Sequence, residues 1–200
     1  MWDWWILGGR FAGSLLATDA SGLAVTNPPY GDILKNAAPG EPCDQVRRGS
    51  LDIEGMRQRA AENAEEIWAK AAPVLAKHGV PTPRRQFTEQ EPRKAGLLMS
   101  SEAWNAWHEQ PGMRELREIA DFSEDPGVMF DCTREEFIAT ARQRALAEYA
   151  FLSNETGWLH SRTYDEHWEP VATLNYAERV NRVIEQASAD TLVSLVDYHS

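Results

Sequence analysis

The sequence predicts an α+β fold, in which a small mixed or antiparallel sheet joins strands from the two ends of the chain and amphipathic helices cover it. Three observations predict this class. Short runs of large apolar residues stand near both ends, in "WWIL" and "TLVSLV". Residues 53–75 repeat apolar side chains at steps of three and four, the period of an amphipathic helix. The 200 residues, 42% of them hydrophobic, suit one domain of ordinary size.

The N-terminal stretch "MWDWWILGGRFAG" predicts a strand followed by a bend. Residues 4–8 are large and apolar, as in a buried strand, and Gly8 and Gly9 allow the chain to turn. Residues 11–18 are then expected to form the hairpin partner of this strand. The segment 19–43 is rich in Gly, Pro, Asn and Asp, which predicts a loop within the single domain 1–200.

The most regular predicted element is the helix that begins at Ile53. Gly79 and Pro81 are in the order that ends a helix, while Pro73 is expected to kink or interrupt its last turns. The polar, proline-rich residues 80–94 predict a linker or surface loop. A helical insertion is expected at about 80–132.

Short helices are expected in this insertion. Trp104 and Trp107 share one face of the first helix, which the Pro-Gly pair at 111–112 ends, and residues 113–119 form the second. Beyond it, Thr133 and Glu136 have the spacing of a capping box, which predicts the start of a further helix.

The C-terminal part of the chain predicts a hairpin, a helix and a strand. The capped helix is expected to run to about Glu148, followed by a hairpin over 149–162 with its turn at "NETG". Residues 173–187 predict a helix with Leu174 facing inward. Residues 192–196 suit a buried strand in the same sheet as residues 4–7.

Composition limits the classes of function. The formal charge of -11, with 31 Asp and Glu against 20 Lys and Arg, argues against direct binding to nucleic acid, which depends on clustered cations. The sequence has no apolar run of about 18 residues and no signal-peptide pattern, so we expect a cytoplasmic protein that binds no membrane. Cys43 and Cys132 are expected to be reduced and structural, and no cofactor is expected.

The turn Gly8-Gly9-Arg10 has two interpretations. It could be a small anion nest, in which backbone N–H groups and a guanidinium converge on a phosphate or carboxylate. The favoured interpretation is a glycine bend with Arg10 stacked on an indole or paired with an acid, because no helix starts directly after the glycine pair. Asp3 is the candidate partner.

A few histidines and aspartates could form a metal or acid–base site: His160, Asp165, His167, Asp197 and His199. Asp197 and His199 would share a face of a strand. A surface or hydrogen-bonded structural role is nonetheless favoured, no metal is expected, and no catalytic residue is assigned. The alternative enzymatic set is Arg10, His160, Asp197 and His199, which should converge in one pocket if the protein is an enzyme.

Residues 115–136 carry a concentrated run of acids. A solvated face is the ordinary explanation of such a run. The sharper hypothesis is that these carboxylates imitate nucleic-acid phosphates and occupy the basic groove of another protein. The tryptophan pair beside them is most simply explained as core, although exposed tryptophans next to acids would anchor such an interface. The partner-binding residues expected on this hypothesis are Glu115, Glu118, Asp121, Glu124, Asp125, Trp104 and Trp107.

Four stretches carry a resemblance to known proteins: "WDWWILGGRFAG", "CDQVRRGSLDIEGM", "YAFLSNETGWLHSR" and "DTLVSLVDYHS". Their Trp-Asp-Trp-aromatic and Gly-Gly-Arg-aromatic motifs, with a terminal Val-Asp-x-His, resemble a family of phage and prophage proteins with no established activity. Longer members have a further N-terminal strand segment, so the resemblance implies that it is absent here or lies on another chain. The edge of the first strand would then be open to a homodimer, unless the 19–43 loop covers it.

These observations give one leading functional hypothesis and two others. The leading one is a phage or prophage accessory protein that binds and inhibits a host protein, such as a defence or nucleic-acid-processing complex, through its acidic helical surface. The first alternative is an enzyme or small-ligand-binding protein that uses Arg10, Asp197 and His199. The second is a purely structural subunit.

Overall fold

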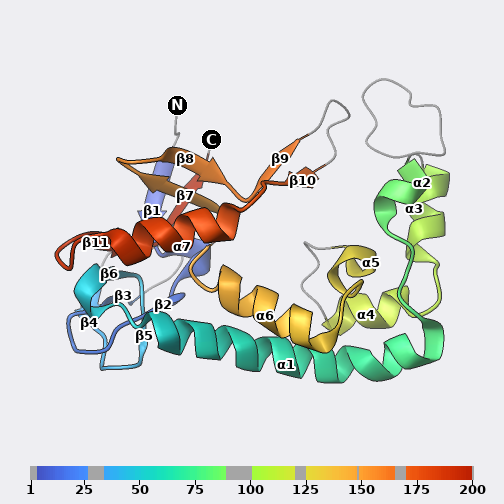
Figure 1. The fold of residues 1–200 in the computed structure, drawn as a ribbon, viewed down its shortest axis with the longest axis horizontal. Helices are drawn as coiled ribbons and strands as arrows, with labels where there is room; N and C mark the ends of the chain where they lie inside the picture. The colour runs from blue at the N-terminus through green and yellow to red at the C-terminus, as the bar shows by residue number, and fades with distance from the viewer. Residues whose placement is uncertain are drawn as a thin grey trace. The chain divides into compact units, whose positions relative to one another are not determined.

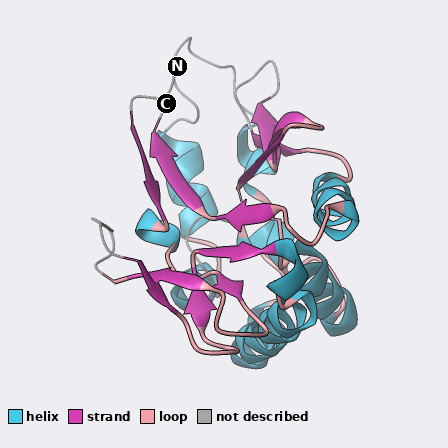
Figure 2. Ribbon diagram, turned by 90° about the vertical axis from the view of Figure 1, so that its left-hand side faces the viewer, coloured by secondary structure: helices cyan, strands magenta, loops and turns pink. Residues whose placement is uncertain are grey.

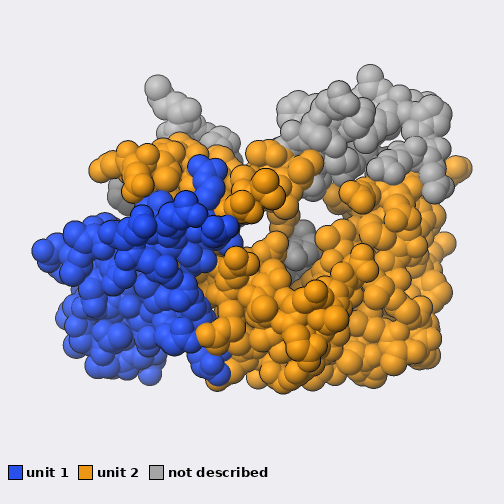
Figure 3. All heavy atoms as spheres, in the orientation of Figure 1, with its two compact units in different colours: residues 1–59, 177–200 blue, residues 60–176 orange. Residues whose placement is uncertain are grey.

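The computed structural model describes residues 4–26, 34–88, 101–119, 125–147, 149–164 and 170–199. It confirms the α+β class, with helices and several small antiparallel sheets (Figures 1 and 2). The chain divides into two compact units, residues 1–59 with 177–200 and residues 60–176 (Figure 3). The single domain expected from the sequence stays a prediction.

The first unit pairs the two ends of the chain. Strand β1 (Trp4–Leu7) is antiparallel to β12 (Val196–His199), with Leu7 opposite Val196. The predicted joining of N-terminal and C-terminal strands is therefore confirmed. In the described residues β12 is the one neighbour of β1, and self-association through the other edge of β1 stays a prediction.

A second sheet of the first unit has the strand order β11-β6-β3-β4, and a third pairs β2 with β5. The predicted strand 192–196 is divided between two sheets, because β11 pairs with β6 while Val196 already belongs to β12. Leu195, between them, is buried and donates its N–H to the carbonyl of Asp44. The strands of these two sheets are β2 (Leu15–Leu16), β3 (Leu23–Val25), β4 (Leu34–Asn36), β5 (Pro42–Cys43), β6 (Gln45–Arg47) and β11 (Leu192–Ser194).

Two N-terminal predictions were wrong. Residues 11–18 are not the hairpin partner of β1, because the 3-10 turn η1 (Gly9–Phe11) redirects the chain and β2 pairs with β5. The expected loop 19–43 contains β3, β4 and β5, with β3 and β4 paired to each other. The glycines and prolines of this segment mark the turns between short strands.

Helix α7 (Tyr176–Gln186) is held at its C-terminus by Arg48 of the 3-10 turn η2 (Arg48–Ser50). The Arg48 guanidinium donates through Nε to the carbonyl of Ile184 at 3.1 Å and through Nη2 to that of Glu185 at 2.9 Å. These carbonyls lack partners within the helix, so the arginine acts as a cap. Val180 and Ile184 are buried, whereas Leu174 precedes the helix and is 82% exposed, contrary to prediction.

Helix α1 (Ile53–His78) begins after Asp52, whose carboxylate accepts the Gly55 N–H at 2.8 Å. It continues through Pro73, so the predicted interruption was wrong, while the alternative of a kink at Pro73 stays a prediction. Pro73 lies on the exposed side, where water can satisfy the carbonyl that loses its helical partner. The end at Gly79, which has a φ of 78°, was predicted correctly.

The second unit has an aromatic core between α1, α4 (Met113–Ile119), α5 (Pro126–Met129) and α6 (Arg134–Arg144). Ala71, Val74, Leu116 and Phe130 are buried at its centre. Trp68 meets Phe130 edge-on, with ring centroids 6.0 Å apart, an arrangement that aromatic quadrupoles favour.

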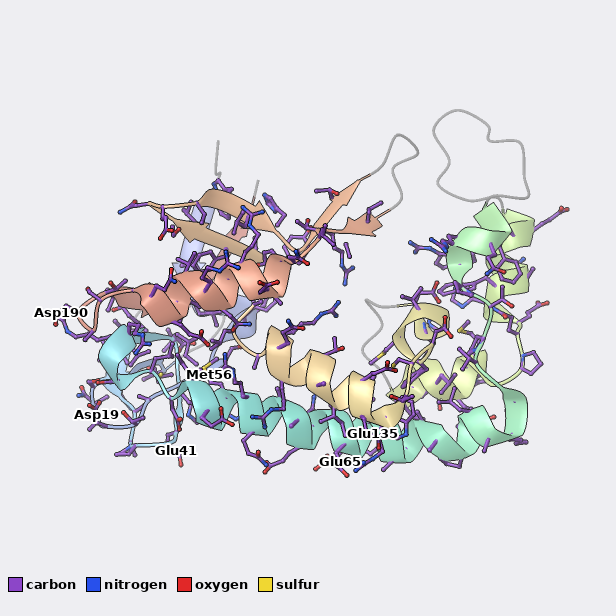
Figure 4. The ribbon with its side chains drawn as sticks, viewed as in Figure 1. Asp19, Glu41, Met56, Glu65, Glu135 and Asp190 are labelled. Atoms are coloured by element: carbon purple, nitrogen blue, oxygen red, sulfur yellow. The ribbon has the colours of Figure 1, made fainter. Side chains whose placement is uncertain are left out.

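Helix α6 has the predicted capping box, in which Thr133 and Glu136 satisfy each other's backbone N–H groups. It ends at Arg144, before the expected end at about Glu148. Arg134 pairs with Glu65 of α1 and lies 3.6 Å from Glu135, and Figure 4 shows these two carboxylates where α1 and α6 adjoin.

Short helices and hairpins complete the second unit. Residues 80–94 were predicted as a linker, but α2 (Arg84–Thr88) lies within them, and α3 (Ser101–His108) is the predicted first tryptophan helix. The predicted hairpin is formed by β7 (Ala150–Ser153) and β8 (Gly157–His160). A further antiparallel pair consists of β9 (Arg162–Tyr164) and β10 (Pro170–Ala172). No described helix has both the length and the apolar character needed to cross a membrane.

Candidate functional site

The Gly8-Gly9-Arg10 turn closes around one buried carboxylate. Asp197 on β12 accepts the backbone N–H of Arg10 at 3.0 Å and its Nε–H at 2.8 Å through Oδ2. Its Oδ1 accepts from Nη2 of Arg10 at 2.6 Å. The Asp197 side chain is only 2% exposed, whereas that of Arg10 is 66% exposed. The turn therefore pairs with an acid, as favoured from the sequence, but with Asp197; Asp3 lies outside the described residues.

The two glycines make this geometry possible. Gly8 and Gly9 have φ angles of 71° and 55°, which side-chain-bearing residues rarely adopt. A Cβ on Gly9 would lie 2.3 Å from the Cβ of Asp197, and one on Gly8 would lie 2.9 Å from Oδ1 of Asp44. The place that a bound anion would take in a nest is thus filled by the chain's own carboxylate.

Asp44 is a second buried carboxylate beside this turn, and sequence reasoning missed it. Its Oδ1 accepts the N–H of Gly13 at 2.6 Å, and its Oδ2 accepts that of Val25 at 2.7 Å. These bonds connect the turn after η1 with strand β3. The available signal was an acid directly after Cys43, at the end of the segment 19–43 that was expected to be a loop.

The hydrogen bond from Arg10 is the main cause that lowers the pKa of Asp197 below its usual range, although burial acts in the opposite direction. The same contact raises the pKa of Arg10. Asp197 therefore remains ionised at neutral pH, with both carboxylate oxygens engaged by donors. This arrangement suits a fixed clamp between η1 and β12 better than it suits proton transfer.

The alternative catalytic set also contains His160 and His199. His160 is exposed on β8 of the other compact unit, where its ring stacks on Trp158 with centroids 5.6 Å apart. His199 is the last residue of β12, and its side chain, like Asp165 and His167, lies outside what the structure describes. Among the described residues, no three His, Cys, Asp or Glu side chains form a group that could hold a metal.

The tryptophans of α3 divide between surface and core. Trp107 is 4% exposed, whereas Trp104 is 43% exposed. Trp104 packs on the ring of Trp107, with centroids 5.4 Å apart, and on that of His108, with centroids 4.4 Å apart. The expected shared face is present, but only Trp104 presents its indole to solvent.

Two arginines flank the buried indole of Trp107. The guanidinium carbon of Arg84 lies 6.0 Å from its ring centre, and that of Arg117 lies 5.6 Å away, within cation–π range. Nη1 of Arg117 is also 2.5 Å from Nδ1 of His108. Burial, and then the charge of Arg117, lowers the pKa of His108, which favours a neutral ring that can accept this hydrogen bond. These contacts join α3 to α4.

The expected partner-binding acids have different environments. Glu115 and Glu118 are exposed on α4, where Glu115 lies 3.7 Å from His78 and Glu118 lies 3.5 Å from Arg114. Asp125 instead caps α5, because its carboxylate accepts the N–H of Gly127 at 3.0 Å and that of Arg84 at 2.5 Å. Asp121 and Glu124 lie outside the described residues.

The described residues thus present two kinds of polar arrangement. Arg10 and Asp197 form a closed clamp, while α3 and α4 present a supported indole and exposed carboxylates. In the second arrangement the side chains of Trp104, Glu115 and Glu118 are exposed. Comparison of the chain with models of protein families, with curated proteins and with solved structures finds no match in any of the three.

Proposed function

We propose that this chain is a binding protein whose α3–α4 surface, defined by Trp104, Glu115 and Glu118, contacts a protein that carries basic residues. The observation that carries the proposal is the exposed indole of Trp104, held on a buried aromatic support beside exposed acids. The resemblance to phage and prophage proteins suggests a host protein as the partner and inhibition as the effect.

The support of Trp104 favours binding energetically. A tryptophan that is already fixed by neighbouring rings loses little conformational freedom when a partner covers it. Its packing on Trp107 and His108 supplies this rigidity, and the arginines that flank Trp107 link the helix to α4. Interfaces are enriched in such aromatic anchors, and a few of them carry most of the binding energy.

The charges of α4 favour a basic partner. Glu118 pairs with Arg114 at 3.5 Å, but both side chains are exposed, so the pair contributes little and can exchange for a partner's cation. Residues 60–176 also carry most of the chain's excess of acidic over basic residues. A negative field of this kind accelerates association with a positive surface and makes that association sensitive to salt.

The enzymatic alternative has less support. Arg10 and Asp197 do meet, but they satisfy each other in the clamp between η1 and β12. The exposed edge of Arg10 remains available to solvent, yet its charge is balanced by the buried carboxylate. A small-ligand site at this place would need further groups that the described residues do not supply there.

The proposal is tested by capturing partners from a host lysate with four forms of the protein. These are the parent, Trp104→Ser, Glu115→Lys with Glu118→Lys, and a matched charge control. The control is Glu66→Lys with Glu155→Lys, which reverses two exposed acids elsewhere in the same unit. Trp158→Ser serves as a second control, because it removes an exposed indole from β8 instead of α3.

We expect the parent and both controls to capture the same protein. The α4 charge reversal should lower its association rate and weaken the salt dependence of binding, and Trp104→Ser should raise its dissociation rate. Circular dichroism should show that all variants remain folded, because exposed charges contribute little to stability and the indoles of Trp104 and Trp158 are both exposed. Equal affinity of the parent, Trp104→Ser and the α4 variant would refute the proposed surface.

A further inference from the structure

Residues 80–85, with the sequence "VPTPRR", lead from α1 into α2 and are held along their backbone by side chains. We call this segment the strap. The side-chain amide of Gln110 accepts the Thr82 N–H at 2.7 Å and donates to the Thr82 carbonyl at 3.0 Å. The carboxylate of Asp125 accepts the Arg84 N–H at 2.5 Å. Residues 81 and 83 are prolines, so these contacts satisfy every backbone N–H from residue 81 to residue 84.

The strap fits closely against α5. Val80 and Thr82 each precede a proline, which favours extended backbone at both positions, and Pro81 is buried. A Cβ at Gly127 of α5 would lie 2.5 Å from the carbonyl oxygen of Pro81 and 2.7 Å from the nitrogen of Pro83. The missing side chain at residue 127 therefore lets the strap backbone approach the helix. Extended segments that contain proline are a recurrent class of peptide ligand.

The strap also places an arginine on the buried indole of Trp107. The guanidinium carbon of Arg84 lies 6.0 Å from the ring centre, within cation–π range. Nε1 of the same indole is buried and has no hydrogen-bond partner in the parts of the chain that the structure describes. A buried donor without an acceptor is unfavourable. A segment that offered an oxygen to this N–H would therefore gain a hydrogen bond that the strap does not make.

We propose that Trp107, Gln110, Asp125 and Gly127 form a peptide-binding site, which the strap occupies as an internal ligand. The external ligand is an extended segment of a partner protein that carries proline and arginine, and it binds by replacing the strap. That this partner is the protein bound by the α3–α4 surface rests on the proposed function, whereas the exchange of the strap does not.

The contacts and the charge of the site identify this occupant. Gln110 and Asp125 bind backbone groups, which any extended segment can offer, while the indole of Trp107 favours a guanidinium. The acidic excess of residues 60–176 attracts a segment that carries cations. The site also adjoins the proposed surface, because the ring of Trp104 packs on that of Trp107 with centroids 5.4 Å apart.

The first experiment measures binding of a fluorescent peptide with the sequence of residues 79–88 to the whole protein. The tethered strap competes at a high effective concentration, so the parent should bind this peptide weakly. Arg84→Ser weakens the strap and leaves the residues of the site intact. We expect it to bind the peptide about two- to ten-fold more tightly than the parent, because the strap leaves the site more often. Arg85→Ser, at the next position in the chain, is the matched control and should bind as the parent does.

A second peptide, with serine at the position of Arg84, checks that the same contact is made between molecules. It should bind the Arg84→Ser protein more weakly than the first peptide does, by about the factor that the protein variant gains. Equal affinity of the folded parent and Arg84→Ser for the first peptide would overturn the proposal. Absence of binding to both proteins at millimolar peptide would overturn it as well.

Hydrogen exchange locates the peptide on the parent and does not depend on the folding of any variant. Bound peptide should remove the protection of the Thr82 and Arg84 amides, because it takes their acceptors on Gln110 and Asp125. The N–H of Gly127, which donates to Asp125 at 3.0 Å, should stay protected. Peptide binding that leaves the strap amides protected would overturn the proposal. Strap exchange without partner capture through Trp104 would contradict only the proposed function, and capture that leaves the strap in place would contradict only this inference.

Discussion

Replacing Asp197 by asparagine tests the clamp between η1 and β12. The carboxylate accepts three N–H groups of Arg10 at 2.6 to 3.0 Å and is almost fully buried. An asparagine keeps one acceptor oxygen in place of two, and its amide NH2 would face an N–H donor of Arg10. The exposed guanidinium of Arg10 can form hydrogen bonds with water instead, so the hydrogen bonds that are lost without replacement are those of the buried residue 197. We expect the free energy of unfolding to fall by about 1–3 kcal/mol at pH 7.

The same variant makes a prediction about pH. Because the Arg10 contact lowers the pKa of Asp197 in the folded protein, its contribution is complete above the unfolded-state pKa of about 3.9. That contribution is lost as the pH falls through the folded-state pKa. Asparagine lacks this contribution at every pH. The difference in free energy of unfolding between the parent and Asp197→Asn should therefore be constant from about pH 5 to pH 8 and shrink in more acidic solution.

Urea unfolding followed by circular dichroism at a series of pH values measures both effects. A double-mutant cycle with Arg10→Gln separates the pair from the remaining contacts of Asp197, and we expect the double variant to lose less stability than the sum of the single variants. Equal stability of the parent and Asp197→Asn at pH 7 would refute this reasoning. A difference that persists unchanged well below pH 4 would also refute it, because the carboxyl of the unfolded parent binds a proton there and this favours unfolding.

Three further predictions concern local packing, capping and thiol burial. Gly127→Ala should lower the free energy of unfolding by about 1–3 kcal/mol, because its Cβ would lie 2.5 Å from the carbonyl oxygen of Pro81; an unchanged urea midpoint would contradict this packing. Thr133→Ala should remove about 1 kcal/mol through loss of the capping box, and an unchanged helical signal and midpoint would contradict the capping role. Burial raises the pKa of the Cys43 thiol to about 11, and burial also raises the pKa of the half-buried Cys132 thiol, so a thiol reagent at pH 8 should label Cys132 slowly in the native protein and Cys43 only after unfolding; rapid native labelling of Cys43 would contradict its burial.

Much of the local structure was predictable because its signals lie within a few residues. The apolar period of α1, the Thr133–Glu136 capping box and the "NETG" turn of the β7–β8 hairpin each depend on neighbours in the sequence. The joining of β1 with β12 was predicted from two apolar runs. The division of the C-terminal run between two sheets depends on which strand each residue meets, and apolar content alone does not determine that choice.

The clamp shows what local signals omit. The glycine pair and Arg10 were recognised as a turn that could hold an acid, but the acid stands 187 positions away in the sequence, so proximity in the chain suggested Asp3 instead. Asp125 was grouped with the acids of α4 because they are near in sequence, although its backbone position makes it the cap of α5. In the same way, Trp104 and Trp107 share a helix face, and the packing of α2 and α4 determines which of them is buried.

The most direct test of the proposed function is to locate the interface by hydrogen exchange. Backbone amides of the protein are compared with and without the captured partner under conditions where both remain folded. The account predicts added protection over residues 101–119, with the amides of β7 and β8 unchanged, and loss of this protection in Trp104→Ser. Protection confined to β7 and β8, or to the turn around Arg10, would contradict the assignment of binding to the α3–α4 surface.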